Sequence, residues 1–217
     1  MRVITPAAFK VYTFNELPKN VQSAVLDANR FILTDEDYWY DFIYDDFQNV
    51  IAPLFGIEVG LDDKGNALIN FQLHQQGAGA RFAGSWEQTP DVLQKVSEHS
   101  PQDKALQEIA GAFQREYEAS KERGDELHAT MKFRPYPHYY HEGTVEIEVF
   151  NEHGDELEGP NLNRGYEPID GALRGLMTWL FERIESEWDF CVSDERLIEY
   201  FLDPVHEFRG DGEIFIN

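Results

Sequence analysis

The chain is a strongly acidic sequence of 217 residues, with 41 acidic and 18 basic residues and a formal net charge of −23. Aromatic residues make up 14% of it, which excludes an acidic disordered tail, because such tails contain few aromatic residues. Its single cysteine excludes an internal disulfide, and no apolar run approaches the ~20 residues of a membrane span. We therefore expect a folded cytoplasmic protein that binds neither membranes nor nucleic acid directly, since its field repels both.

The first part of the chain predicts a short strand, two helices and then three further strands. Residues 9–14 have the composition of a short strand, and helical spacing of apolar residues follows Asn15. A second helix is expected over residues 35–54, capped at Thr34 or Asp35. Its predicted apolar stripe consists of Trp39, Phe42, Ile43, Phe47, Val50, Ile51 and Leu54. Residues 57–74 predict a hairpin, and residues 80–86 predict a third strand.

The middle of the chain predicts a helical pair followed by two neighbouring strands. Residues 91–98 predict a short helix, and Ser100-Pro101 opens another one. Apolar and polar residues alternate over 126–134 and again over 144–150, which is typical of half-buried strands. The segment 135–143 between them predicts an aromatic hairpin tip.

The last third predicts two helices and a terminal hairpin. A strong helix is expected after a polar loop over 151–166, and a further helix begins at Ser193-Asp194. Residues 206–216 predict a hairpin that turns at Gly210-Asp211-Gly212. The whole pattern predicts a single α+β domain over residues 1–217, in which helices pack mainly on one face of an antiparallel sheet.

Three stretches of the chain are similar to known sequences: QLHQQGAGARFAGSW (72–86), LHATMKFRPYPHYYHEGTVEIEV (127–149) and TWLFERIESEWDFCVSDERLIEY (178–200). In this order and spacing they resemble an uncharacterised family of phage and prophage proteins, some of them loosely described as antitoxin-like. The resemblance extends from Phe14 to the last hairpin. It departs at Gln75, where the family pattern has serine, and at Ala78, where the pattern has aspartate. The resemblance implies a phage or prophage setting and very little mechanism.

The glycine-rich loop QQGAGARFAG (75–84) has two interpretations. Its backbone N–H groups could cradle a phosphate. However, no Lys-Ser/Thr pair follows and a strand comes next, so it matches neither a P-loop nor a dinucleotide fingerprint. The sequence favours a structural turn or bulge.

A metal site and a catalytic nucleophile have weak sequence support. The candidate metal ligands are His138, His141 and Glu142, together with His74 or His128. A zinc site needs three or four convergent ligands, and two histidines on a loop favour a hydrogen-bonded hairpin tip instead. Cys191 lies between apolar neighbours, as a buried small hydrophobe does. We therefore predict no catalytic residue, no metal and no cofactor.

The acidic segments carry the functional prediction. The stretch DEDYWYDFIYDD (35–46) has six carboxylates and no basic residue. On a helix, Asp37, Asp41 and Asp45 would lie on one face, about 6 Å apart along the axis. Like charges at this spacing cost about 0.2–0.5 kcal/mol per pair. The predicted partner-binding residues are Asp35, Glu36, Asp37, Asp41, Asp45 and Asp46 on this face, and Glu182, Glu185, Glu187, Asp189, Asp194, Glu195, Glu199 and Asp203 on a second one.

These observations predict a non-enzymatic inhibitor encoded by a phage or prophage. It would bind the basic surface of a host DNA- or RNA-binding protein by imitating DNA, with Tyr38, Tyr40 and Tyr44 as anchors between the charges. Dimerisation would lengthen the imitation. One alternative is an antitoxin-like protein that neutralises a toxin through its acidic surface. Another is a metal- or carboxylate-dependent enzyme that acts through His138, His141 and nearby acids.

Overall fold

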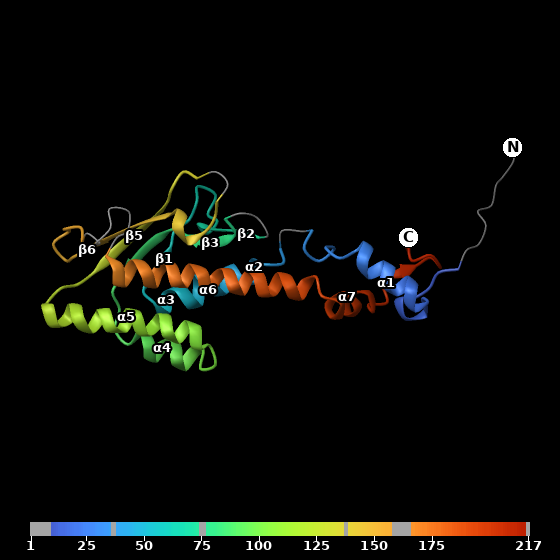
Figure 1. The fold of residues 1–217 in the computed structure, drawn as a ribbon, viewed down its shortest axis with the longest axis horizontal. Coiled ribbons are helices and arrows are strands. Elements are labelled where there is room, and N and C mark those ends of the chain that lie inside the picture. Colours follow the sequence, from blue (N-terminus) through green and yellow to red (C-terminus); the bar gives the residue numbers. More distant parts are fainter. Residues whose placement is uncertain (1–9, 36–37, 74–76, 137–138, 158–165, 216–217) are drawn as a thin grey trace. The chain divides into compact units, whose positions relative to one another are not determined.

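The computed structural model describes residues 10–35, 38–73, 77–136, 139–157 and 166–215 (Figure 1). The chain forms two compact units. The central unit is Tyr40–Glu185, and the terminal unit combines Met1–Trp39 with Ser186–Asn217. Helices and antiparallel sheets together confirm the predicted α+β class. The prediction of one domain over residues 1–217 stays a prediction.

A four-stranded antiparallel sheet organises the central unit, in the order β1-β4-β5-β6. Its strands are β1 (Ile57–Val59), β4 (Gly84–Glu87), β5 (His128–Phe133) and β6 (Val145–Phe150). Buried residues alternate along β6 with residues that are exposed or half-buried, as the sequence predicts. On the other face Lys132 of β5 forms a 2.9 Å salt bridge with Glu148 of β6. The two predicted strands are therefore confirmed as antiparallel neighbours, with Lys132 opposite Glu146.

The predicted hairpin over 57–74 forms only next to its turn, where Leu61 and Ala67 form an antiparallel bridge and the backbone N–H of Leu68 donates a 2.7 Å bond to the oxygen of Gly60. Beyond this point its two strands separate. β2 (Ile69–Gln72) pairs with β3 (Gly79–Phe82) in a separate two-stranded sheet, whereas β1 pairs with β4. The close approach at Gly84 explains this division. Its φ is +153°, and a Cβ atom there would lie 2.1 Å from the backbone oxygen of Glu58. The chain can bend at this glycine, so β3 and β4 pair with different partners.

The predicted helix over 35–54 is shorter than expected and irregular. It begins as α2 (Asp41–Asp46), continues as a π-helical turn (Phe47–Ile51) and ends as α3 (Ala52–Leu54). The buried residues Ile43, Phe47 and Ile51 follow one another at four-residue intervals. Phe42 was assigned to the buried stripe but is 56% exposed. It lies one residue before Ile43, which turns it by about 100° away from the buried face.

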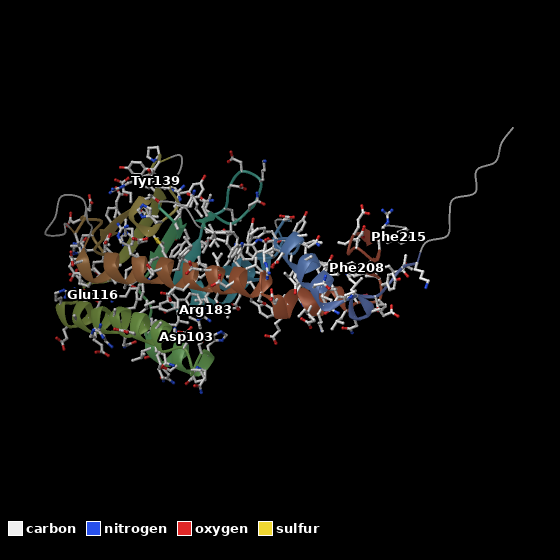
Figure 2. All side chains as sticks on the ribbon, turned by 45° about the vertical axis from the view of Figure 1, so that its right-hand side comes forward. Asp103, Glu116, Tyr139, Arg183, Phe208 and Phe215 are labelled. Carbon is white, nitrogen blue, oxygen red and sulfur yellow. The ribbon has the colours of Figure 1, made fainter. Side chains whose placement is uncertain are left out.

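Three helices lie on one side of the four-stranded sheet: α4 (Val92–His99), α5 (Lys104–Arg123) and α6 (Glu167–Cys191) (Figure 1). Asp103 joins two of them. One of its carboxylate oxygens accepts a bond of 2.9 Å from the backbone N–H of Leu106 and caps α5. The other accepts a 2.9 Å bond from the indole N–H of Trp179 on α6. Figure 2 labels Asp103. The predicted packing of helices on one face of the sheet is confirmed.

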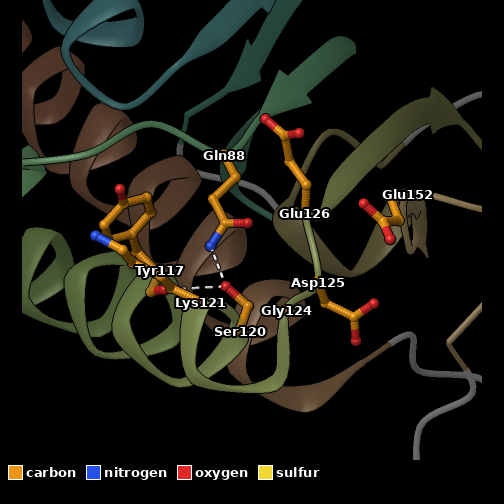
Figure 3. Close-up of a pocket in the computed structure, with 8 residues that line it drawn as sticks. All are labelled: Gln88, Tyr117, Ser120, Lys121, Gly124, Asp125, Glu126 and Glu152. Carbon is orange, nitrogen blue, oxygen red and sulfur yellow. Dashed lines mark hydrogen bonds between the residues drawn. The ribbon is translucent and has the colours of Figure 1, made fainter.

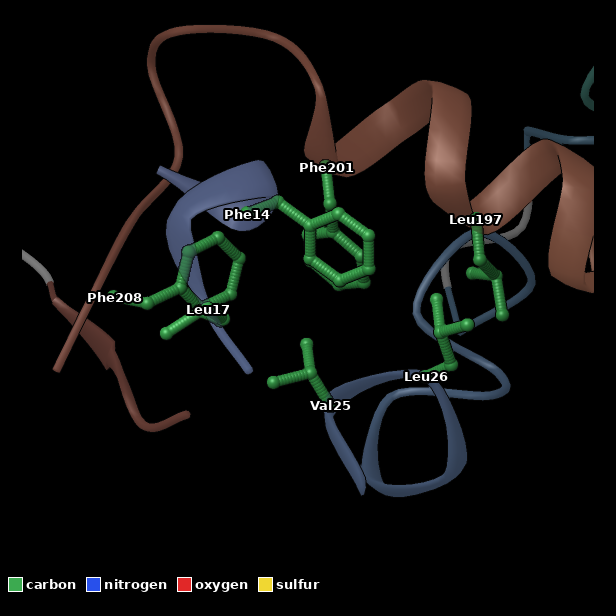
Figure 4. Close-up of a cluster of buried hydrophobic side chains, with 7 residues drawn as sticks. All are labelled: Phe14, Leu17, Val25, Leu26, Leu197, Phe201 and Phe208. Atoms are coloured by element: carbon green, nitrogen blue, oxygen red, sulfur yellow. The ribbon is translucent and has the colours of Figure 1, made fainter. Parts of the chain in front are cut away.

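The terminal unit is built from both ends of the chain. It contains the 3-10 turn η1 (Phe14–Glu16), α1 (Lys19–Ala28), α7 (Asp194–Phe201), β7 (Glu207–Phe208) and β8 (Ile214–Phe215). Its buried core consists of Phe14, Leu17, Val25, Leu26, Leu197, Phe201 and Phe208 (Figure 4). The predicted strand over 9–14 is reduced to a single bridge between Tyr12 and Phe208. None of the helices in the described ranges is long and apolar enough to cross a membrane.

Candidate functional site

The acidic residues around α2 fall into two groups. Asp41, Asp45 and Asp46 are exposed on the helix, and none forms a salt bridge with a described residue. Asp41 and Asp45 are one turn apart, so their carboxylates emerge from the same face. Asp35 is exposed but precedes the helix, which corrects the prediction that the helix begins there. Glu36 and Asp37 lie outside the described residues.

In the second acidic segment, Glu182 to Asp203, some carboxylates form salt bridges and others do not. Asp194 forms a salt bridge with Arg30, and Glu199 forms one of 2.6 Å with Arg196. Asp203 accepts a bond from the backbone N–H of Val205. Glu187 is half-buried and accepts a 3.6 Å bond from the Cys191 thiol. The members left exposed and without a salt bridge to any described residue are Glu182 and Glu185 in the central unit, and Asp189, Glu195 and Asp203 in the terminal unit.

The three tyrosines predicted as contact anchors differ in exposure. Tyr38 is 73% exposed. Tyr40 and Tyr44 are half-buried and pack on Phe71, with ring centroids 4.9 and 6.2 Å from that of Phe71. Burial among these rings raises the pKa of Tyr44. Of the three tyrosines, only Tyr38 is exposed, and it belongs to the terminal unit. On α2 itself, Phe42 is an exposed apolar side chain.

The glycine loop and the hairpin tip, which are far apart in sequence, pack against each other. A Cβ atom at Gly77 would lie 2.2 Å from Cδ1 of Tyr139, and one at Gly79 would lie 2.6 Å from Cβ of His141. Both glycines have positive φ, which favours the structural turn that the sequence predicts. Glycine is needed here because the hairpin segment occupies the space of a side chain.

Of the candidate metal ligands, the structure brings together His141 and Glu142, with Nδ1 and Oε2 3.7 Å apart. His74 and His138 lie outside the described residues. His141 accepts a 3.1 Å bond at Nδ1 from the backbone N–H of Gly143, and the ring of His128 stacks on that of Phe150. Among the described residues, no group of three or more histidine, cysteine, aspartate or glutamate side chains could hold a metal ion.

Cys191 is buried at the end of α6, as the sequence predicts. Burial raises the pKa of its thiol to about 11, and the carboxylate of Glu187 adds to this effect. A thiol with this pKa is almost fully protonated at neutral pH and is a poor nucleophile.

A shallow pocket with a volume of about 310 Å³ lies where α5 meets the start of β5 (Figure 3). Gln88 donates a hydrogen bond to Ser120 Oγ, and its side-chain oxygen accepts a 2.9 Å bond from the backbone N–H of Leu127. The carboxyl-bearing lining residues are Asp125, Glu126 and Glu152. This lining favours positively charged groups over anions.

One buried charge, Arg81 of β3, was not singled out by the sequence pattern. It is only 5% exposed, although arginine is rarely fully buried without a paired charge. It lies within the glycine-rich stretch that the sequence assigns to a structural turn. One sequence feature could have indicated that Arg81 is buried. It is the only basic residue in a short run of small and apolar residues, Gly79-Ala80-Arg81-Phe82.

Comparison with protein families gives one match. Residues 39–194 match the family described as Domain of unknown function (DUF8835). The chain belongs to this family. The match covers the whole central unit and assigns no activity to it. Comparisons with curated proteins and with solved structures found no match.

Proposed function

We propose that this member of the DUF8835 family is a non-enzymatic inhibitor that binds the basic surface of a nucleic-acid-handling protein by imitating DNA. We propose further that a phage or prophage encodes it, that it acts in the host cytoplasm and that its target is a host protein. The phage setting rests on the sequence resemblance alone. The observation that carries the proposal is the set of exposed carboxylates on α2 and α6 without salt bridges to described residues: Asp41, Asp45, Asp46, Glu182 and Glu185.

The charge density sets the scale of this imitation. Carboxylates one helical turn apart repeat about every 6 Å along the axis. Each strand of duplex DNA carries one charge per ~3.4 Å. One helix face is therefore sparser than a phosphate row, so several acidic segments must contribute to one interface. A partner's lysines and arginines would gain affinity by releasing counterions, as they do on DNA.

Salt bridges reduce the number of carboxylates that can contribute their full charge to the proposed binding surface. Asp194 and Glu199 are already neutralised by Arg30 and Arg196, so they contribute less than their formal charge. The exposed rings of Tyr38 and Phe42 supply apolar area, which a purely electrostatic interface lacks.

Affinity capture from a bacterial host lysate tests the proposal. The full chain is immobilised, captured proteins are eluted with rising salt, and duplex DNA is added as a competitor. We expect a nucleic-acid-binding protein that elutes at moderate salt and is displaced by DNA. Binding that neither salt nor DNA weakens would refute mimicry, and capture of a basic toxin that DNA does not displace would favour the antitoxin-like alternative.

A matched pair of variants tests the surface itself. Asp41→Lys combined with Asp45→Lys reverses two charges on α2. Glu108→Lys combined with Glu122→Lys changes the net charge equally on α5, where both glutamates are exposed. We expect the first variant to bind the target much more weakly, with the slope of log K against log salt reduced by about 0.9 for each ion pair that the substitution removes. Equal weakening in both variants would show that net charge alone drives binding.

A further inference from the structure

Arg81 is a buried guanidinium with no carboxylate partner among the described residues. Its Nη1 donates a 3.1 Å bond to Thr144 Oγ1, and its Nη2 donates a long 3.4 Å bond to Asn70 Oδ1. Nε is buried and has no hydrogen-bond partner in the described part of the chain. The chain contains 41 acidic residues, yet none of those that the structure describes forms a salt bridge with Arg81. A scarcity of carboxylates therefore does not explain why this cation is unpaired.

Two aromatic rings lie against the guanidinium. Its Cζ atom lies 4.2 Å from the centroid of the Phe133 ring and 4.7 Å from that of Tyr140. A cation–π contact contributes about 0.5–2 kcal/mol, whereas burying an ion costs several kcal/mol. The two rings therefore offset part of the cost of burying Arg81. Further hydrogen bonds can form only in the plane of the guanidinium, because its N–H groups point outward in that plane.

One edge of the guanidinium has unused donors. Nε–H and one N–H of Nη2 form a fork that matches two oxygens of a carboxylate or phosphate. Nε has no partner among the described residues, and Nη2 has only the long bond to Asn70. Such bidentate, charge-assisted bonds are the strongest that arginine makes.

Two chain segments hold this edge in place. Register pairing sets Arg81 of β3 opposite Asn70 of β2. The segment that carries Tyr140 and Thr144 packs on the start of β3, where Gly79 leaves room for His141. The glycine loop and the hairpin tip, which are two separate motifs in the sequence, therefore meet around one cation.

We propose that Arg81 binds a small oxyanion, a phosphate or a carboxylate, through Nε and Nη2. Phe133 and Tyr140 act as positioning residues that fix the plane of the guanidinium, and Thr144 orients it through Nη1. This site is independent of the proposed acidic surface. The field of a chain with net charge −23 repels anions, so oxyanion binding requires a specific cation such as this one.

Titration of the ¹⁵N-labelled full chain with inorganic phosphate, and separately with acetate, tests this site. Sodium chloride at equal ionic strength is the reference, and the arginine Nε–Hε resonances are observed by NMR. We expect a saturable shift of the Arg81 resonance with at least one of the two anions, and the effective anion identifies the ligand class. Arg183 is the control, because its guanidinium also lies near an aromatic ring but is exposed. Its Cζ atom is 5.6 Å from the centroid of the Trp179 ring.

The outcome is decided by three results. No saturable shift with either anion would overturn the proposal, as would an equal shift at Arg183. Arg81→Lys keeps the charge but lacks the fork, so we expect its melting temperature to respond at least 10-fold more weakly to the effective anion. An unchanged response in Arg81→Lys would also overturn the proposal, and the wild-type titration decides the question if this variant does not fold.

Discussion

Replacing Asp170 with asparagine tests how strongly a buried ion pair supports the central unit. Asp170 is 2% exposed and accepts two bonds of 2.8 Å from Nε and Nη2 of Arg174, one helical turn away on α6. The same guanidinium donates to the backbone oxygens of Glu142 and Val145 and so ties α6 to the start of β6. Asp170→Asn keeps the shape of the side chain and leaves the half-buried Arg174 without its counter-charge.

The expected loss in the free energy of unfolding is about 3–5 kcal/mol, the usual cost of breaking a buried pair from one side. For a unit of this size it corresponds to a fall of roughly 6–20 °C in melting temperature. Urea unfolding and thermal unfolding, both followed by circular dichroism, measure the two quantities.

Glu148→Gln is the matched control for this experiment. Its salt bridge to Lys132 is 2.9 Å long, close to the 2.8 Å of the Asp170–Arg174 pair, and lies in the same unit. The Lys132 side chain, however, is 62% exposed. We expect a much smaller change, because solvent screens exposed pairs. Equal losses in Asp170→Asn and Glu148→Gln would refute the reasoning that burial sets the strength of these pairs.

Two further predictions concern a glycine and the cysteine. Gly84→Ala should lower the free energy of unfolding by about 1–3 kcal/mol or more, because the new Cβ atom would lie 2.1 Å from the backbone oxygen of Glu58. Urea unfolding measures this loss. Cys191 should react slowly with iodoacetamide at pH 8 in the native protein, because raising its pKa from 9.0 to about 11 lowers the thiolate fraction by about 100-fold. The Cys191 thiol stays protonated to a higher pH in the folded state than in the unfolded state. The free energy of unfolding should therefore fall as pH rises from about 9 to about 11.

Each of these predictions has its own control. Gly171→Ala, at an exposed helical glycine with nothing within 4 Å of its Cβ position, should instead stabilise the protein by about 0.5–1 kcal/mol. Destabilisation by both glycine substitutions would contradict the steric explanation. For Cys191, the urea-unfolded chain is the reference, and equal alkylation rates in native and unfolded protein would contradict the assigned pKa.

The sequence by itself determined most of the local structure and the exposure of many acids. Period-two alternation placed β5 and β6, because successive strand residues face opposite sides of a sheet. Ser193 located the start of α7, where its side chain accepts a bond from the backbone N–H of Arg196. The carboxylates of α2 were correctly expected on the surface, since an unpaired charge is costly to bury.

Tertiary structure decided which distant segments meet. Arg30 neutralises Asp194 from 164 residues away, which no local charge pattern indicates. Gly84 allows β4 to pair with β1, because a backbone oxygen approaches it too closely for a side chain. Arg81 reaches Thr144 across 63 residues. Periodicity and capping depend on neighbours within a few residues, whereas the surroundings of a buried charge depend on contacts that form only when the whole chain has folded.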